Sequence, residues 1–256
     1  MPFTEIAPTQ LMRKLGGADM PLVLDLCLPE DHALDPVVIP TARRMPFSDV
    51  PNLTVQGPVV CICQKGRKVS QGAAAHLRGR GIAAEVLSGG MIAWREAGLP
   101  VIPSKSLPPQ GASWVTRHRP RIDRLAVPWV LRRFVDPGAR ILYVPSADVS
   151  AVAAHWDAIP FDHPDADLRD GDGRCTFDAV VERFHLSHDA LDALADVVRA
   201  ADGYGESPQA AGLLSISVGL SRRHADDASL LEAAMPLYDA LYRWARDGRD
   251  ETHGHP

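Results

Sequence analysis

A cysteine followed by a short basic loop is the part of this sequence whose residue types point most clearly to chemistry. Cys63 ends an apolar run, and Lys65, Gly66, Arg67 and Lys68 follow it closely. Nearby cations and the positive end of a helix macrodipole both favour a thiolate over a thiol. A thiolate can attack an electrophilic sulfur, and backbone N–H groups can hold the resulting persulfide anion. The pattern therefore predicts a nucleophilic cysteine.

The residues after the cysteine are expected to bind a small anionic sulfur donor. The cations would steer the anion towards the sulfur, and Gly66 would let the loop close tightly around it. The expected donor-binding residues are Gln64, Lys65, Gly66, Arg67, Lys68 and Val69. Cys61 and Cys27 are interpreted as packing residues, although Cys61 and Cys63 together could also suggest a metal-binding pair.

Strands that alternate with helices must position this loop. Short apolar runs typical of buried strands cover residues 22–26, 58–63 and 84–87, and helical spacing covers 9–15 and 69–78. This alternation predicts a parallel sheet flanked by helices, so the fold class of the first half is α/β. The loop then connects the carboxyl end of a strand to the start of a helix.

These residues, in this order and spacing, resemble the rhodanese family. The matching pieces are Asp25, Pro29-Glu30, Ile39-Pro40-x-Ala42, the Cys63 loop, Leu87-Ser-Gly-Gly-Met-Ile-Ala-Trp94 and Gly98-Leu-Pro100. The resemblance implies a rhodanese domain over residues 1–103. It also implies a persulfide on Cys63 that carries sulfur from thiosulfate or a similar donor to cyanide, a thiol or a protein acceptor.

Two positions depart from the rhodanese pattern. Cys27 stands where many members have arginine, which would loosen a structural ion pair, and Thr41 stands where many have glycine. A related phosphatase branch has arginine six residues after the cysteine. The residue there is Val69, so the sequence argues against a phosphatase.

Composition narrows the class of protein further. The chain is 46% hydrophobic and 23% charged, which is typical of a globular protein, and it has no apolar run long enough to span a membrane. Four cysteines and the absence of a recognisable secretory signal favour reduced thiols in the cytoplasm. The net charge of −5 argues against nucleic-acid binding. We therefore expect neither a nucleic-acid nor a membrane partner.

A stretch rich in Pro, Ser and Gly, residues 104–113, is interpreted as a linker. The sequence after it is predicted to be mostly α-helical over residues 114–248. Helical spacing covers 123–134, 191–198 and 230–244, with short strands expected at 141–144 and 159–161. The last residues, 249–256, are expected to form a disordered tail.

Arginines are concentrated at the start of this second half. Arginine presents a planar fork of donors that suits oxyanions, and an extended Arg-x-Arg-x-Arg strip would place three guanidinium groups on one side. The hypothesis is an anion site made of Arg117, His118, Arg119, Arg121 and Arg124. The alternative is that these arginines pair with acids such as Asp162, Asp165 or Asp178.

An acidic, glycine-rich loop follows further along the chain. Asp, His and Cys side chains at 161–163 and 174–178 bracket it and have the chemistry of metal ligands. An ordinary surface loop is the preferred interpretation. We assign neither a metal nor a cofactor.

The second half resembles the C-terminal domain of ChrB-type chromate-resistance proteins. The matching pieces are Thr116-Arg117, Arg119-x-x-x-Asp123-Arg124, Pro128-Trp129 to Asp136-Pro137, Cys175-Thr-Phe-Asp178, Ala211-Gly212 and Leu237-Tyr-Asp-Ala-Leu-Tyr242. Three positions depart from that family's pattern. Val127 stands in place of a cysteine, and Asp170 and Arg199 each stand in place of a histidine. If those family residues bind a metal, their replacement here argues against a metal site.

Sulfur transfer through Cys63 is the preferred function. A first alternative is a sensor or regulatory protein for oxyanion or sulfur stress, in which Cys63 reports a modification and does not turn over. A second alternative is a rhodanese-like reductase of an oxyanion such as chromate or arsenate.

Overall fold

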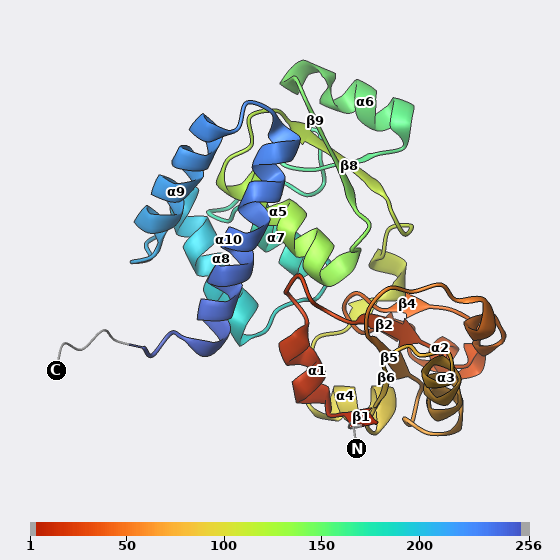
Figure 1. Cartoon of the computed structure of the whole chain (residues 1–256). Coiled ribbons are helices and arrows are strands. Elements are labelled where there is room, and N and C mark those ends of the chain that lie inside the picture. The colour runs from red at the N-terminus through yellow and green to blue at the C-terminus, as the bar shows by residue number, and fades with distance from the viewer. Residues whose placement is uncertain (1–3, 252–256) are drawn as a thin grey trace. The chain divides into compact units, whose positions relative to one another are not determined.

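The computed structural model describes residues 4–251, and the chain divides into two compact units, residues 1–107 and 108–256 (Figure 1). The boundary lies inside the polar stretch 104–113. The end of the expected tail, residues 252–256, lies outside the described residues. Each unit contains its own sheet and helices.

A five-stranded parallel sheet with the order β1-β6-β5-β2-β4 forms the centre of the first unit. The strands are β1 (Glu5–Ile6), β2 (Leu22–Asp25), β4 (Arg43–Arg44), β5 (Val59–Ile62) and β6 (Ala84–Leu87). β5 lies in the middle, and all four of its residues are buried. A strand covered on both faces needs a continuous apolar sequence, which explains the run at 58–63. The predicted strands at 22–26, 58–63 and 84–87 are confirmed.

Helices surround this sheet, and the predicted α/β class is confirmed (Figure 1). They are α1 (Pro8–Lys14), α2 (Pro29–Leu34), α3 (Lys68–Gly79) and α4 (Gly90–Glu96), with 3-10 turns at Phe47–Asn52 and Ser104–Ser106. Two short strands, β3 (Val37–Val38) and β7 (Ile102–Pro103), pair antiparallel beside the main sheet. α3 buries Ala73, Ala74 and Leu77 in the core that also contains Cys61 and Val86.

The second unit is mostly helical, as the sequence predicts. Its helices are α5 (Ile122–Val130), α6 (Val149–Trp156), α7 (Thr176–Arg183), α8 (Asp189–Ala201), α9 (Ala210–Arg223) and α10 (Asp227–Asp247). α5, α8 and α10 pack against one another (Figure 1). Trp129 is fully buried between Phe134, Tyr238 and Tyr242, with ring centroids 5.6–6.3 Å away. None of the helices in residues 4–251 combines the length and the apolar character that a membrane span requires.

A three-stranded parallel sheet with the order β10-β8-β9 completes the second unit. Its strands are β8 (Ser113–Arg117), β9 (Arg140–Val144) and β10 (Ile159–Pro160). The strands expected at 141–144 and 159–161 are confirmed. The central strand β8 was not expected, because the arginines that follow it hide the short apolar stretch.

The helical spacing expected over residues 123–134 is confirmed, with a change of helix type inside that range. α5 ends at Val130, and a π-helical turn, Leu131–Val135, follows. Pro128 lies inside α5 and has no N–H to donate to the carbonyl of Arg124. The hydroxyl of Tyr143 donates to that carbonyl instead, at 2.8 Å. This bond ties the edge strand β9 to α5.

Candidate active site

Cys63 is the first residue after β5 and opens the loop that leads into α3. Gly66 and Gly90 bring this loop against the start of α4. A Cβ atom on Gly90 would lie 2.1 Å from the carbonyl oxygen of Cys63, and one on Gly66 would lie 2.5 Å from that of Leu87. Both glycines have a φ of 63°, in the left-handed region. Any larger residue at either position would therefore displace the loop.

Cys63 is only 7% exposed, and hydrogen-bonding groups lie close to its sulfur. The Ser70 hydroxyl lies 3.1 Å from the sulfur, and the backbone N–H of Arg67 donates to it at 3.4 Å. The same hydroxyl lies 3.1 Å from the carbonyl oxygen of Arg67. An ionised sulfur can only accept, so formation of the thiolate favours donation by Ser70 to Cys63.

Burial by itself raises the pKa of the Cys63 thiol, because a charge is costly away from water. Hydrogen bonds from Ser70 and from the backbone of Arg67 and Lys65 outweigh that effect, and the pKa lies below its ordinary value. Burial raises the pKa of the other three cysteines, Cys27, Cys61 and Cys175, and that of Cys61 reaches about 12. Cys63 is therefore the one cysteine of the four whose pKa lies below its ordinary value, which favours its thiolate.

The residues predicted to bind a donor all lie in this loop or at the start of α3. Gly66 is buried, Gln64 and Val69 are half-buried, and Lys65, Arg67 and Lys68 are exposed. The side chains of these three cations form no ion pair with any residue in 4–251. Their charges remain available to a ligand from solution.

An ion pair supports the neighbouring strand β2 despite the departure at Cys27. Arg44 donates to the buried carboxylate of Asp25 at 2.8 Å and to the carbonyl oxygen of Cys27 at 3.3 Å. The expectation that Cys27 would loosen a structural ion pair is therefore wrong, because Arg44 on β4 supplies the cation. Thr41 adopts a φ of 65°, which explains why a glycine is favoured there.

The structure divides the residues of the predicted anion site. Arg117 donates to the carboxylate of Asp162 at 2.9 Å, and Arg124 lies 3.2 Å from the same carboxylate. Asp162 is buried, so two arginines share one carboxylate of the protein. An anion that binds these two side chains must compete with Asp162.

The other members of that set lie elsewhere. His118 and Arg119 line a cavity beside β9, and Arg121 is exposed at the start of α5. Arg119 has a φ of 54°, so the stretch from Arg117 to Arg121 is not extended throughout. The expectation of three guanidinium groups on one side is wrong for this reason.

Cys175 is fully buried at the start of α7. Its backbone N–H and its thiol both donate to Asp178, and Asp178 forms a bidentate ion pair with Arg199 at 2.9 and 3.0 Å. Across residues 4–251, no group of three or more His, Cys, Asp or Glu side chains is arranged to hold a metal ion. Arg199, which replaces a histidine of the family pattern, pairs with Asp178.

A buried acid also caps α7. Asp123 accepts hydrogen bonds from the backbone N–H groups of Thr176 and Phe177. Burial and the charge of Asp202 raise its pKa to about 7. Tyr238, which lies in the same interior, donates its hydroxyl proton to the carbonyl oxygen of Ile122.

Sequence reasoning missed two residues that shape these sites, Ser70 and Arg44. Ser70 was seen only as part of a helix start, although its position seven residues after Cys63 places it one helical turn beyond the loop. Arg44 acts on Asp25, 19 residues away in the sequence, and no local pattern could identify that partner. Asp162 was among the acids expected as alternative partners of the arginines, and that alternative is confirmed for Arg117 and Arg124.

Comparison with known proteins connects the second unit to a family. The family model described as ChrB, C-terminal domain, matches residues 114–245. Protein ChrB of Cupriavidus metallidurans is 32% identical over 136 residues. This match covers 52% of the present chain and 40% of that relative, so the chain spans about two fifths of the relative's length.

Solved structures similar to the chain include rhodanese-like proteins. A rhodanese-related protein from Thermoplasma volcanium has a TM-score of 0.34 and 23% identity, over 39% of this chain and 98% of that one. A thiosulfate sulfurtransferase from Pseudomonas aeruginosa has a TM-score of 0.36 and 28% identity, over 41% of this chain and 20% of that one. Both scores lie below 0.5, so the chemistry of the first unit must be inferred from its own Cys63 loop.

Proposed function

The chain belongs to the family of the ChrB C-terminal domain through residues 114–245, and we propose that its first unit is a sulfurtransferase acting through a persulfide on Cys63. The observation that carries the proposal is the sulfur itself. It accepts a hydrogen bond from the backbone N–H of Arg67, the Ser70 hydroxyl lies within hydrogen-bond distance of it, and the pKa of the Cys63 thiol is lowered in spite of burial. A stabilised thiolate is what nucleophilic attack on sulfur requires.

In the first half-reaction, the Cys63 thiolate attacks the outer sulfur of thiosulfate. A bond forms between the two sulfurs, the S–S bond of thiosulfate breaks, and sulfite leaves with the electron pair. The donors that hold the thiolate, the Ser70 hydroxyl and the backbone N–H of Arg67, then hold the persulfide anion.

In the second half-reaction, an acceptor attacks the outer sulfur of the persulfide. Cyanide leaves as thiocyanate and a thiol leaves as its own persulfide, and both regenerate the Cys63 thiolate. The exposed side chains of Lys65, Arg67 and Lys68 attract the anionic donor and stabilise the charge that passes through the loop.

Membership in the ChrB family supports a second candidate, a regulatory protein of chromate-resistance type. In that role Cys63 would accept one sulfur and stop. The two candidates predict different stoichiometries, so steady-state turnover separates them. A transferase releases many equivalents of thiocyanate per chain, and a sensor releases one at most.

The decisive experiment combines turnover with intact mass. With thiosulfate and cyanide, the unaltered chain should release thiocyanate continuously, and Cys63→Ser should release essentially none. With thiosulfate alone, an adduct of about 32 Da, one sulfur atom, should map to Cys63. Cys61→Ser, which removes another buried thiol two residues away, is the matched control and should keep most of the activity. Full activity in Cys63→Ser would refute the proposal.

A further inference from the structure

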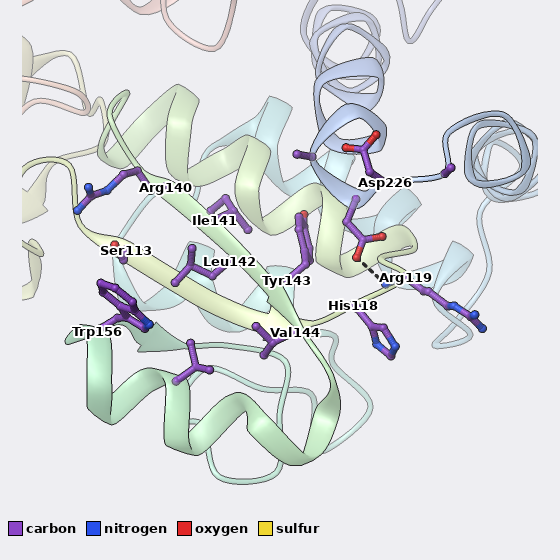
Figure 2. A pocket seen from close by; sticks show the side chains of 14 residues that line it. Ser113, His118, Arg119, Arg140, Ile141, Leu142, Tyr143, Val144, Trp156 and Asp226 are labelled. Atoms are coloured by element: carbon purple, nitrogen blue, oxygen red, sulfur yellow. Dashed lines mark hydrogen bonds between the residues drawn. The ribbon is translucent and has the colours of Figure 1, made fainter.

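A cavity of about 920 Å³ lies beside the edge strand of the second unit (Figure 2). β9 forms its floor, α6 lies along one side, and the start of α10 lies along the other. β9 is the last strand in the order β10-β8-β9, so one of its edges pairs with no strand of residues 4–251. A groove that follows an open strand edge has a shape suited to an extended chain.

The pairing of β9 with β8 shows which of its backbone groups face this groove. The N–H of Arg140 donates to Ala112, and the carbonyl of Val144 accepts from His118, so both residues face β8. Alternate residues of a strand direct their backbone groups to the same neighbour. Ile141 and Tyr143 therefore direct their N–H and C=O groups to the open edge, where a second strand could pair with them.

The walls of the groove are apolar on the side of α6. Leu142 and Val144 pack with Val152 against the interior, and Trp156 projects beside them. The Trp156 side chain is 65% exposed. A β-branched or aromatic residue of an added strand would cover it.

The charged residues at the two ends of the groove differ in whether they already have a hydrogen-bond partner. Arg140 lies at the Trp156 end, and its side chain has no hydrogen-bond or ion-pair partner in the described part of the chain. At the other end, Asp226 accepts from the backbone of Ser229, and Asp227 accepts from the backbone of Arg119. The Arg140 side chain can therefore pair with a carboxylate of a ligand, whereas both acids already accept hydrogen bonds from backbone N–H groups.

We propose that the groove binds an extended peptide of a partner protein, which adds to β9 as a fourth strand. The peptide pairs with the backbone of Ile141 and Tyr143, places apolar side chains against Trp156, and presents a carboxylate to Arg140. β-strand addition takes its affinity from main-chain hydrogen bonds and its specificity from alternate side chains. A second copy of β9 fits less well, because Arg140–Val144 contains no carboxylate.

Four labelled hexapeptides test the proposal with the full chain. Each alternates valine and threonine, and carries Asp or Lys at either its first or its last position. Fluorescence anisotropy should show binding of one Asp probe, with its Lys counterpart at least about fivefold weaker. Absence of binding by all four probes, or equal binding of the Asp and Lys probes, overturns the proposal.

Charge reversal then locates the contact. Arg140→Glu should reverse the preference, so that the Lys probe binds better than the Asp probe. Arg223→Glu is the matched control, because this exposed arginine on α9 lies outside the residues that line the groove. The control should keep the original preference. An unchanged preference in Arg140→Glu refutes the assigned carboxylate contact.

Amide hydrogen exchange distinguishes strand addition from other modes of binding. The Asp probe should slow exchange at Ile141 and Tyr143 and leave Leu142, which already pairs with β8, unchanged. Binding without that alternation overturns the pairing. Sedimentation equilibrium tests whether a second copy of the chain occupies the groove. Self-association that protects these two amides without peptide would show that a second copy fills the groove, contrary to the proposal.

Discussion

The Cys63 loop and the Arg117–Arg124 stretch carry similar concentrations of cations, and the fold uses them in opposite ways. The side chains of Lys65, Arg67 and Lys68 are exposed and have no ion-pair partner among residues 4–251. Arg117 and Arg124 converge on the buried carboxylate of Asp162. A cluster of cations in a sequence therefore predicts anion binding only where the fold brings no carboxylate opposite it.

Removal of the Asp162 carboxylate should produce the largest loss of stability among the variants considered. It should also leave Arg117 and Arg124 without an ion-pair partner, like the cations of the Cys63 loop. Asp162→Asn leaves Arg117 and Arg124 without their carboxylate. A broken buried ion pair costs about 3–5 kcal/mol. Because Arg117 is 38% exposed and water will screen it, we expect a loss of about 2 kcal/mol, measured by chemical denaturation. Glu182→Gln, which breaks the exposed pair with Arg174, is the matched control and should change stability little.

The same variant tests the predicted anion site. With Asp162 neutral, sulfate should stabilise Asp162→Asn more than the unaltered chain, because the two arginines can then accept an external oxyanion. Equal stabilisation of both proteins would mean that the anion binds elsewhere or that Arg117 and Arg124 do not bind it.

Neutralisation of the loop cations should affect kinetics and leave stability unchanged. Lys65→Ala together with Arg67→Ala removes two charges that form no ion pair with an acid of residues 4–251. Each charge contributes on the order of 1 kcal/mol, so the thiosulfate kcat/KM should fall about 25-fold, and less at high salt. Arg43→Ala together with Lys105→Ala controls for the change in net charge. Unchanged thiosulfate kinetics would show that the backbone N–H groups alone bind the donor.

Loss of the Ser70 hydroxyl should raise the pKa of the Cys63 thiol by removing a donor to the thiolate. A hydrogen bond to a charged group is worth about 1.5 kcal/mol or more, which corresponds to about one pH unit. Iodoacetamide reacts with the thiolate. At a pH below the raised pKa, Ser70→Ala should therefore be alkylated more slowly than the unaltered chain, and at a pH above it the two rates should be equal. Ser48→Ala, on an exposed turn, is the control. An unchanged pH profile would assign the lowered pKa to the backbone donors.

These contrasts mark what the sequence could reveal. The β5 run and the Cys63 loop are local patterns, since burial on both sheet faces demands apolar residues and a tight loop demands glycine. The role of Gly90 depends on a segment 27 residues away, and the pairing of Arg117 depends on Asp162. The strand β8 was not predicted because its apolar stretch is short and arginines follow it directly. Local periodicity predicts elements, but tertiary partners decide whether a charge is free.

The smallest expected effect is a change in the stability of the first unit through its strained residue Thr41. Thr41 is buried with a φ of 65°, a conformation that strains a β-branched residue by about 1–3 kcal/mol. Glycine adopts this conformation without strain, but it loses about 0.5–1 kcal/mol through the greater freedom of the unfolded chain. Thr41→Gly should therefore stabilise the first unit by about 1 kcal/mol in chemical denaturation.

Thiosulfate kinetics of Thr41→Gly should equal those of the unaltered chain, because the substitution adds no charge and removes no donor from the sulfur. Thr41→Ala serves as the matched control, since alanine keeps a Cβ atom and thus part of the strain. A stabilised protein with unchanged kinetics would show that the losses in the loop variants come from the missing cations and not from a change in stability. If Thr41→Gly instead destabilised the protein, the side chain would have to make a packing contribution larger than the strain that its backbone carries.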